Sequence, residues 1–325
     1  MRYERSWMTA VARQISNAVE SVRVFDLEPS QGVVPYALGS HIDVEVCLDG
    51  RDDVRSYSLV GEGPVAGAYR IAVKRVSQSR GGSRYMWSLK EGATLRISEP
   101  ASHFTLRTGS REYLLVAGGI GITPLIGMAE SLARRAVPFR LLYAGRAREH
   151  MAFLTELEQR LGERLVVFAD GEGAGLDLAS EIRRLHVDGE IYVCGPVGLM
   201  ESVRRAWLSA GRPLDRFRIE TFGSSGHRDA ESFEVSVLDY GQTIAVAGHQ
   251  SLLDVLTASG IDVPGHCKRG ECGLCVVAVL DVNGEIDHRD VFLSDEQKAE
   301  GQLLCPCVSR AIGRIAIDTG HRSAL

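Results

Sequence analysis

The sequence predicts a multidomain chain in which an antiparallel β-barrel is followed by an α/β domain with a parallel sheet and by a C-terminal β-grasp domain. Residues 10–107 hold short segments of alternating apolar and polar residues, interrupted by Gly or Pro. Residues 108–224 instead contain continuous apolar runs separated by helical patterns, as in a buried parallel sheet. The alternation returns from Glu231, where five of the seven cysteines also lie. We therefore predict domains at 1–107, 108–224 and 231–325, with a polar linker at 225–230.

Length and composition are those of a globular protein. The 325 residues are enough for two or three domains, and 45% of them are hydrophobic and 24% charged. Residues 1–7 have no apolar core like that of a signal peptide, and no apolar run approaches the roughly 18 residues of a membrane span. Seven cysteines in a chain of this size suit a reducing compartment better than a disulfide framework. We expect a cytoplasmic protein that does not enter a membrane.

Charge is unevenly distributed along the chain. Residues 231–325 contain 14 Asp and Glu against 7 Lys and Arg, a net charge of −7, which leaves +2 on residues 1–230. The acidic, cysteine-rich third could present a docking face to a basic partner, although the same charge also serves solubility alone. Nothing in the sequence indicates a nucleic-acid partner.

Two motifs in the first domain suit a flavin. The segment RSYSL at 55–59 follows the alternating pattern of a strand, so Arg55 and Tyr57 share one face. A flavin needs a flat aromatic surface, a hydroxyl or amide near its ring nitrogen N5, and a cation for its phosphate. Further along, Gly81, Gly82 and Ser83 open an expected helix, where free N–H groups and a capping hydroxyl would bind a phosphate. Together the two motifs predict flavin binding.

The second domain carries the pattern of a dinucleotide site. An apolar strand at 113–117 leads into GGIGITP at 118–124 and then into a helical pattern, which is the usual setting for a phosphate. Three further strands, at 139–145, 165–169 and 191–194, end next to Arg146, at Asp170 and at Cys194-Gly195-Pro196. Carboxyl ends of parallel strands are where open α/β sheets bind ligands. Cys194 is either an ordinary buried thiol or a neighbour of a nicotinamide ring.

The third domain is organised around its cysteines. Strands are expected at 233–238, 243–246 and 276–280, with a helix from Ser251 to about Gly260 and a turn at 283–284. Cys267, Cys272 and Cys275 have the C-x4-C-x2-C spacing of a plant-type [2Fe–2S] cluster. A zinc site would show a second Cys-x-x-Cys or Cys-x-x-His pair, which this loop lacks.

The fourth cluster ligand is either Cys305 or Cys307. Cys305 leaves the gap of 29 residues after Cys275 that plant ferredoxins show. Cys307 instead stands in a Cys-Val-Ser run that leads into the alternating segment 313–318, as the ferredoxin ligand leads into the final strand. Counting back from that segment favours Cys307. Lys268 and Arg269 in the loop either raise the cluster potential by stabilising its reduced form or are merely solvated.

In their order along the chain, these motifs resemble the phthalate dioxygenase reductase family, the single-chain reductases of Rieske oxygenases. The shared motifs are RSYSL at 55–59, GGS at 81–83, GGIGITP at 118–124, YVCGP at 192–196, ETFG at 220–223 and the cysteine loop at 267–275. The resemblance covers nearly the whole chain. It implies a flavin barrel, a nucleotide domain like that of ferredoxin reductases, and a plant-type ferredoxin domain.

The resemblance also implies cofactors and site residues. The flavin would be FMN, held by Arg55, Ser56, Tyr57, Ser58, Val73, Lys74, Gly81, Gly82 and Ser83. The nucleotide would be NADH rather than NADPH, although Arg146 could tolerate a 2′-phosphate, and it would lie along Gly119, Thr123, Pro124, Arg146, Asp170, Cys194, Gly195 and Pro196. Ser58, Cys194 and Phe222 would lie nearest the reacting rings. Cys267, Cys272, Cys275 and Cys307 would bind the cluster.

The implied activity is NADH-dependent electron transfer through FMN and [2Fe–2S] to a Rieske-type oxygenase. The chain lacks the Cys-x-His pairs of a Rieske centre, so that oxygenase would be a separate partner. Two alternatives stay open at this point. The same electron chain could serve a haem monooxygenase or a free ferredoxin, or the ferredoxin domain alone could act as a non-catalytic redox adaptor.

Overall fold

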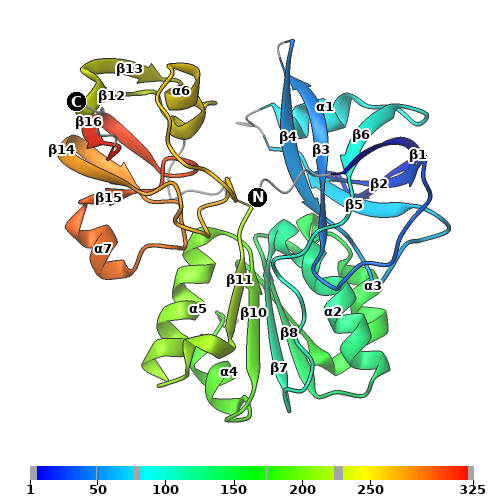
Figure 1. Ribbon diagram of the computed structural model, residues 1–325. Helices are drawn as coiled ribbons and strands as arrows, with labels where there is room; N and C mark the ends of the chain where they lie inside the picture. The colour runs from blue at the N-terminus through cyan, green and yellow to red at the C-terminus, as the bar shows by residue number, and fades with distance from the viewer. Residues whose placement is uncertain (1–5, 49, 77–80, 173–174, 223–229, 321–325) are drawn as a thin grey trace. The chain divides into compact units, whose positions relative to one another are not determined.

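The computed structural model describes residues 6–48, 50–76, 81–172, 175–222 and 230–320 (Figure 1). The chain forms two compact units. The first comprises residues 1–195 and 202–220, and the second comprises residues 196–201 and 221–325. Three sheets account for most of the regular structure, two in the first unit and one in the second. Within the described residues, no helix combines the length and the apolar character needed to cross a membrane.

The first sheet is a six-stranded antiparallel barrel. Its strands lie in the order β4-β3-β6-β1-β2-β5, and an antiparallel bridge between Leu59 and Ile71 joins the two ends of that order. Phe25, Ile42 and Val44 are fully buried inside it, as the alternating pattern predicts. The bounds are β1 (Trp7–Val19), β2 (Val22–Pro29), β3 (His41–Leu48), β4 (Arg51–Ser58), β5 (Tyr69–Lys74) and β6 (Thr94–Ser98), with helix α1 (Gly82–Ser88) between β5 and β6.

The second sheet is parallel throughout, in the order β11-β10-β7-β8-β9, with α2 and α3 on one face and α4 and α5 on the other (Figure 1). The chain enters at the central strand β7, runs outward through β8 and β9, and then returns to the other side of β7 with β10. The gap between the carboxyl ends of β7 and β10 is therefore a topological switch point, where such sheets bind ligands. The bounds are β7 (Tyr113–Gly118), α2 (Thr123–Arg134), β8 (Phe139–Gly145), α3 (Leu154–Leu161), β9 (Leu165–Ala169), α4 (Leu178–Arg184), β10 (Glu190–Cys194), α5 (Val197–Ser209) and β11 (Phe217–Glu220).

Two tyrosines of the parallel sheet fasten the segment that leads out of the barrel. The buried Tyr192 hydroxyl accepts a hydrogen bond from the Arg107 N–H at 2.8 Å, and the Tyr113 hydroxyl donates to the Arg107 carbonyl at 2.8 Å. The Tyr192 ring also meets Phe104 edge-to-face, with centroids 5.5 Å apart. The segment therefore has a defined path between the barrel and the parallel sheet.

We expect Tyr192→Phe to lower the free energy of unfolding of the first unit by about 1–3 kcal/mol, because the Arg107 N–H would lose its hydroxyl partner. Thermal unfolding followed by flavin release or circular dichroism would report this loss. Tyr85→Phe is a matched control, because no hydrogen bond of the Tyr85 hydroxyl is found within the described residues. Equal melting temperatures for Tyr192→Phe and the unmodified protein would contradict the assignment.

The third sheet is mixed, as in a β-grasp domain, in the order β13-β12-β16-β14-β15. Strands β12 and β16 pair in parallel, whereas the other neighbours pair antiparallel. Helix α6 begins after Ser251, whose hydroxyl accepts the Asp254 N–H at 3.1 Å, as its N-cap position requires. The bounds are β12 (Phe233–Val237), β13 (Gln242–Val246), α6 (Leu252–Ala258), β14 (Val277–Asp287), α7 (Asp295–Glu300), β15 (Leu303–Leu304) and β16 (Arg310–Asp318).

The expected turn at 283–284 is wrong, because β14 continues through both residues to Asp287. Asn283 pairs with Arg314, and Gly284 pairs with Gly313 on β16. Gly284 has φ +131°, and a Cβ on it would lie 1.9 Å from the Ile312 carbonyl oxygen. The glycine therefore permits a close approach of two backbones within a long strand pair. An Asn-Gly pair alone does not distinguish this use from a hairpin turn.

Candidate active site

Strand β4 presents the expected face for a planar ligand. Arg55 and Tyr57 are both half-buried on one face of the strand, and Arg55 forms a 2.7 Å ion pair with Asp53. Burial raises the pKa of Tyr57 well above its ordinary value, and the nearby Arg55 charge only partly offsets this. The phenol therefore keeps its proton at neutral pH and can donate a hydrogen bond. Ser56 points elsewhere, and its hydroxyl donates to the Asp43 carboxylate at 2.5 Å.

The glycine turn at the start of α1 lies against this strand. A Cβ on Gly82 would come within 2.7 Å of the Arg55 side chain, so the two predicted flavin motifs are in direct contact. Gly81 is the N-cap, with φ +91°, and no side chain caps the helix. The expected capping by Ser83 is therefore wrong. Because the glycine conformation moves the N-cap to residue 81, Ser83 falls inside the first turn, where its hydroxyl accepts the Val76 N–H at 3.3 Å.

At the end of β4, Ser58 reaches the edge of the parallel sheet. Its buried hydroxyl lies 3.5 Å from Oε2 of Glu220, the last residue of β11. No role was predicted for Glu220 from the sequence, although this residue belongs to the ETFG motif at 220–223. Val73 is placed differently, because its side chain lies in the barrel core and its carbonyl accepts the Trp87 indole N–H at 3.1 Å.

At the switch point, the turn after β7 meets the end of β10. Residues Gly119–Ile122 form a 3-10 helix that leads into α2, and the Thr123 hydroxyl donates to the Ile120 carbonyl at 3.0 Å. A Cβ on Gly121 would lie 2.2 Å from the Cys194 carbonyl oxygen and 2.8 Å from the Gly195 nitrogen. The two motifs that were predicted to hold a nucleotide are thus packed backbone to backbone, and Pro124 follows in the first turn of α2.

Two cations lie close together beside this turn. Lys74 ends β5 and Arg146 follows β8, and a Cβ on Gly119 would lie 4.0 Å from the Lys74 Nζ. Reduced hydration and repulsion by the Arg146 guanidinium both hold the pKa of Lys74 below its ordinary value. An anion placed here would relieve that repulsion. Asp170 joins the same edge of the sheet through its N–H, which donates to the Gly145 carbonyl at 3.0 Å.

The remaining predicted residues of the nucleotide site differ in accessibility. The Cys194 side chain is fully buried, and its residue pairs with Ala117 on β7 and with Glu220 on β11. Pro196 and the half-buried Phe222 belong to the second unit, so a place for them beside the flavin and the nucleotide stays a prediction.

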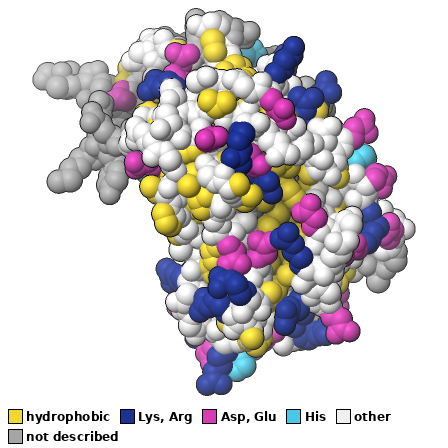
Figure 2. Space-filling model, turned by 90° about the vertical axis from the view of Figure 1, so that its right-hand side faces the viewer, with side chains coloured by type: hydrophobic (Ala, Val, Ile, Leu, Met, Phe, Trp, Pro, Cys, Tyr) yellow, Lys and Arg dark blue, Asp and Glu magenta, His cyan; other side chains and the backbone are white. Residues whose placement is uncertain are grey.

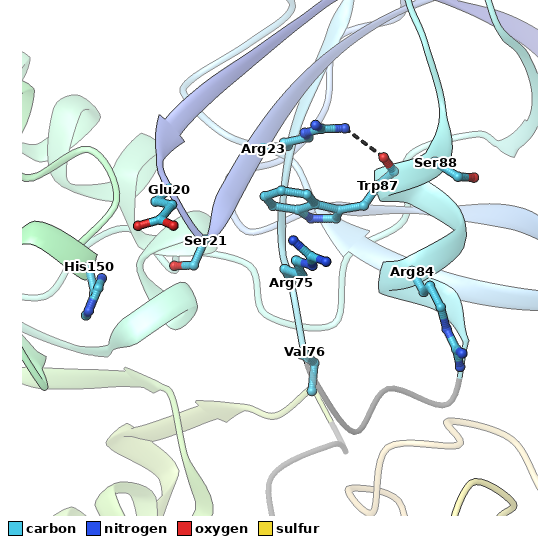
Figure 3. Close-up of a pocket in the computed structure, with 9 residues that line it drawn as sticks. All are labelled: Glu20, Ser21, Arg23, Arg75, Val76, Arg84, Trp87, Ser88 and His150. Atoms are coloured by element: carbon cyan, nitrogen blue, oxygen red, sulfur yellow. Dashed lines mark hydrogen bonds between the residues drawn. The ribbon is translucent and has the colours of Figure 1, made fainter.

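A basic cavity of about 900 Å³ is lined by the barrel, by α1 and by His150 in the short helix after β8, and none of its lining residues was predicted (Figure 3). The Trp87 ring stands between two guanidinium groups, that of Arg23 at 4.4 Å from the ring centroid and that of Arg75 at 5.5 Å (Figure 3). The lining residues are Glu20, Ser21, Arg23, Arg75, Val76, Arg84, Trp87, Ser88 and His150. Three arginines against one glutamate give the cavity a positive charge. Charged side chains are also spread over the face in Figure 2, with both signs interspersed.

In the second unit, four cysteine residues gather where the loop after α6 meets the segment between β15 and β16. The Cys307 thiol is within hydrogen-bonding reach of both Cys267 and Cys275, whereas Cys305 reaches Cys275. Hydrogen bonding from Cys307 lowers the pKa of Cys267 to about 4, and contacts with Cys305 and Cys307 lower that of Cys275 to about 3. The same contacts and burial raise the pKa values of Cys305 and Cys307.

The loop around these thiols is shaped to stabilise negative sulfur. The N–H groups of Arg269 and Glu271 donate to the Cys267 sulfur at 3.4 and 3.5 Å, and Gly270 and Gly273 take φ values of +76° and +69°. Four converging thiols, two of which have strongly lowered pKa values, suit an iron–sulfur cluster better than an uncharged hydrophobic core. Cys272 is exposed, and among the described residues no three His, Cys, Asp or Glu side chains are placed so that they could hold a single metal ion.

Three features of this chain together define a flavin-dependent iron–sulfur oxidoreductase. They are the barrel face that suits a flavin, the switch point of the parallel sheet that suits a nucleotide, and the cysteine loop. Three family descriptions match accordingly. They are an oxidoreductase FAD-binding domain at residues 9–106, an oxidoreductase NAD-binding domain at residues 115–205 and a 2Fe-2S iron–sulfur cluster binding domain at residues 235–311. The chain therefore binds a flavin, NAD and a [2Fe–2S] cluster.

Similar proteins narrow the class. The chain is 37% identical to the heme-dependent oxidative N-demethylase beta subunit of Ectopseudomonas mendocina, over 90% of this chain and 92% of the relative. It is 36% identical to the phenoxybenzoate dioxygenase subunit beta of Ectopseudomonas oleovorans, over 91% and 92%. The solved structure of phthalate dioxygenase reductase matches with a TM-score of 0.74 and 31% identity, over 96% of this chain and 98% of that one. The chain belongs to the phthalate dioxygenase reductase family, as the sequence motifs predicted.

Proposed function

We propose that this protein takes electrons from NADH, through FMN and a [2Fe–2S] cluster, to a separate Rieske-type oxygenase. The observation that carries the proposal is the meeting of the Gly121 turn with Cys194 at the switch point, in the same unit as the Arg55 and Tyr57 face. A flavin accepts an electron pair and releases single electrons to a cluster, which carries one at a time. The protein itself has to hold the donors and acceptors in place and exclude water between them.

FMN would rest on the β4 face. The Tyr57 ring offers the flat surface, and the Ser58 hydroxyl, fixed near Glu220, offers a hydrogen bond at the inner end of the strand. The phosphate would lie against the N–H groups of Gly82 and Ser83 and the Arg55 guanidinium, which this structure places in contact with Gly82. FMN is preferred over FAD because the site would end at this single phosphate. The matching family description names an FAD-binding domain, so the choice between FMN and FAD has to be made by experiment.

NADH would bind with its phosphates beside Lys74, Arg146 and the Gly119 turn. The repulsion between the two cations makes that place favourable for an anion, since the nucleotide neutralises both. Thr123 holds the turn through the Ile120 carbonyl, so the N–H groups of the helix start stay directed at the ligand. Asp170, at the end of β9, would lie near the adenosine ribose and favour NADH over NADPH by repelling a 2′-phosphate.

This arrangement predicts a pH dependence of nucleotide binding. Lys74 attracts the nucleotide only while protonated, so affinity should fall as the pH rises through its pKa, and this pKa lies below that of an ordinary lysine. Arg146→Ala should weaken NAD binding about tenfold, by removing one charged contact. It should also move the midpoint of the pH profile upward, because the repulsion of Lys74 is relieved. Binding of NAD, measured from pH 7 to 10.5, tests both effects, and an unchanged midpoint in Arg146→Ala would contradict them.

Cys267, Cys272, Cys275 and Cys307 are the proposed cluster ligands. Cys307 is favoured over Cys305 because it reaches two of the loop thiols instead of one. Cys272 would turn inward from its exposed position when the cluster binds. None of the seven cysteines, all of which lie in the described part of the chain, is in a disulfide, which supports a cytoplasmic location.

The oxygenase partner has two candidate types. The likeness to phenoxybenzoate dioxygenase subunit beta and to phthalate dioxygenase reductase supports a dioxygenase of the Rieske type. The likeness to a heme-dependent oxidative N-demethylase subunit favours a haem enzyme as the second candidate. A plant-type cluster has a reduction potential of about −400 mV. Electron transfer from it to either type of oxygenase is therefore downhill when the acceptor has a higher potential.

An anaerobic titration of the purified protein with NADH, followed by absorbance and by identification of the released flavin, tests the core of the proposal. We expect a flavin band and an iron–sulfur band to bleach together, with about three electrons taken up per chain, because a flavin accepts two and a [2Fe–2S] cluster one. The released flavin should be FMN. Persistence of the iron–sulfur band while the flavin bleaches would refute electron transfer between the two centres, and released FAD would refute the choice of FMN. Reduction rates with purified Rieske and haem acceptors would then separate the two partner types.

A further inference from the structure

The segment from Asp287 to Leu293 is buried behind the cysteine loop, and no predicted function uses it. Asp290 is fully buried, and Asp287 and Arg289 are nearly so. Asp287 and Arg289 form an ion pair at 2.6 Å. The segment joins the end of β14 to the start of α7, so it passes between the two stretches of chain that supply the cysteines.

One side of this segment holds the turn that contains Cys307. The N–H groups of Val308 and Ser309 donate to the Cys305 carbonyl, which closes the turn. The buried Ser309 hydroxyl then donates to Asp290 Oδ1 at 2.8 Å and accepts the Arg289 N–H at 3.0 Å. The position of Cys307 therefore depends on the Ser309 hydroxyl, two residues away, and on the Asp290 carboxylate that accepts its hydrogen bond.

The other side of the segment holds the cysteine loop. The Val291 N–H donates to the Gly270 carbonyl at 3.0 Å, between Cys267 and Cys272 in sequence. A Cβ on Gly270 would lie 2.9 Å from the Asp290 Cα and 2.6 Å from a Val308 methyl carbon. The cysteine loop, the 287–293 segment and the turn that contains Cys307 are thus in close contact. A displacement of Asp290 would therefore displace both the loop and the turn.

Asp290 is also held as an anion. Burial by itself would raise its pKa, but the neighbouring His288 imidazole, hydrogen bonds from the Leu293 N–H and the Ser309 hydroxyl, and the charge of Lys298 keep the pKa below its ordinary value. The Leu293 N–H donates to Oδ2 at 2.9 Å, and His288 Nδ1 stands 3.6 Å from Oδ1. The charge lies near the cysteines, because Asp290 packs against Gly270, between Cys267 and Cys272, and accepts a hydrogen bond from Ser309, two residues after Cys307.

We propose that Asp290, acting through Ser309, is a positioning residue that sets the distance between Cys307 and the cysteine loop and places a fixed negative charge beside the [2Fe–2S] cluster. The inference rests on the proposed cluster ligands. The hydrogen bonds keep the fourth thiol in place for cluster binding, and the charge disfavours the added electron. Loss of Asp290 should therefore shorten the lifetime of the cluster and raise its potential, whereas loss of Ser309 should act mainly on lifetime.

The test uses the full chain as Asp290→Asn, Ser309→Ala and the double variant, with Asp281→Asn as control, since Asp281 is an exposed acid on β14. Iron and sulfide content, the rate of cluster loss in excess chelator and the cluster potential by dye-coupled titration are the readouts. Substitutions of groups that hydrogen-bond around metal ligands cost about 10- to 100-fold in metal retention, and we expect each single variant to lose its cluster faster by that factor. The double variant should be no worse than the worse single variant, because both remove one contact.

Asp290→Asn should also shift the cluster potential upward, and Asp281→Asn should match the unmodified protein in every readout. Unchanged lifetime and potential in Asp290→Asn, or multiplied losses in the double variant, would overturn the proposal. If Asp290→Asn fails to fold by circular dichroism, the lifetime in Ser309→Ala decides. Absence of iron in the unmodified protein would instead refute the proposed function, and flavin reduction by NADH should stay normal in every variant.

Discussion

Cys307→Ser is expected to leave the protein without a stable cluster while NADH still reduces its flavin. A serine hydroxyl is a poor ligand for iron, and Cys307 is the thiol that reaches both Cys267 and Cys275. Reduction of cytochrome c, a one-electron acceptor that we expect to take its electrons from the cluster, should fall by more than roughly 100-fold, beyond the loss expected for a supporting residue. Reduction of ferricyanide directly by the flavin should change little, because the first unit is untouched.

Cys305→Ser is the matched control, since Cys305 stands two residues away and is equally buried. It should keep nearly full iron content and cytochrome c reduction. The reverse result, with loss in Cys305→Ser and retention in Cys307→Ser, would assign the fourth ligand to Cys305. Equal loss of flavin reduction in both variants would mean that the cluster is needed for folding of the whole chain.

Gly121→Ala is expected to impair the NADH reaction and to leave the cluster intact. The added Cβ would lie 2.2 Å from the Cys194 carbonyl oxygen, which is a rigid backbone group, so the turn after β7 would have to move. Overpacking of this kind costs about 1–3 kcal/mol. If that cost falls on the nucleotide-bound state, the rate of flavin reduction at low NADH should fall by about 10- to 100-fold.

Stopped-flow reduction of the flavin over a range of NADH concentrations would measure this effect. Gly175→Ala is a suitable control, because a Cβ there meets nothing within 4 Å. A Gly121→Ala protein with normal flavin reduction would show that the turn after β7 does not hold the nucleotide. Normal iron content and dithionite reduction of the cluster would show that the second unit is unaffected.

Much of the fold could be predicted because the deciding signals are local. Continuous apolar runs such as 113–117 can bury both faces only inside a parallel sheet, and the structure places that run as the central strand β7. The spacing of Cys267, Cys272 and Cys275 likewise identifies an iron–sulfur loop, because the loop itself supplies three ligands.

Local signals failed where a residue serves two uses equally well. Asn283-Gly284 is a good hairpin turn, yet it lies within β14 because pairing with β16 along the whole strand outweighs the turn. Ser83 is a good N-cap residue, yet Gly81 takes that position and leaves Ser83 in the first turn. In both cases a glycine conformation that depends on distant contacts decided the outcome.

By itself, the sequence determined the three kinds of domain, their order, the flavin and nucleotide motifs and the cysteine loop, since each is encoded within a short stretch of chain. Only the tertiary structure decided that Lys74 lies near Arg146 and that Gly121 packs against Cys194. It also decided that the Asp290 carboxylate accepts a hydrogen bond from the Ser309 hydroxyl. These pairs are separated by 19 or more residues in sequence, and no periodicity or spacing links them. They form because the topology of the sheets brings loop ends together, and it is at those loop ends that the chemistry takes place.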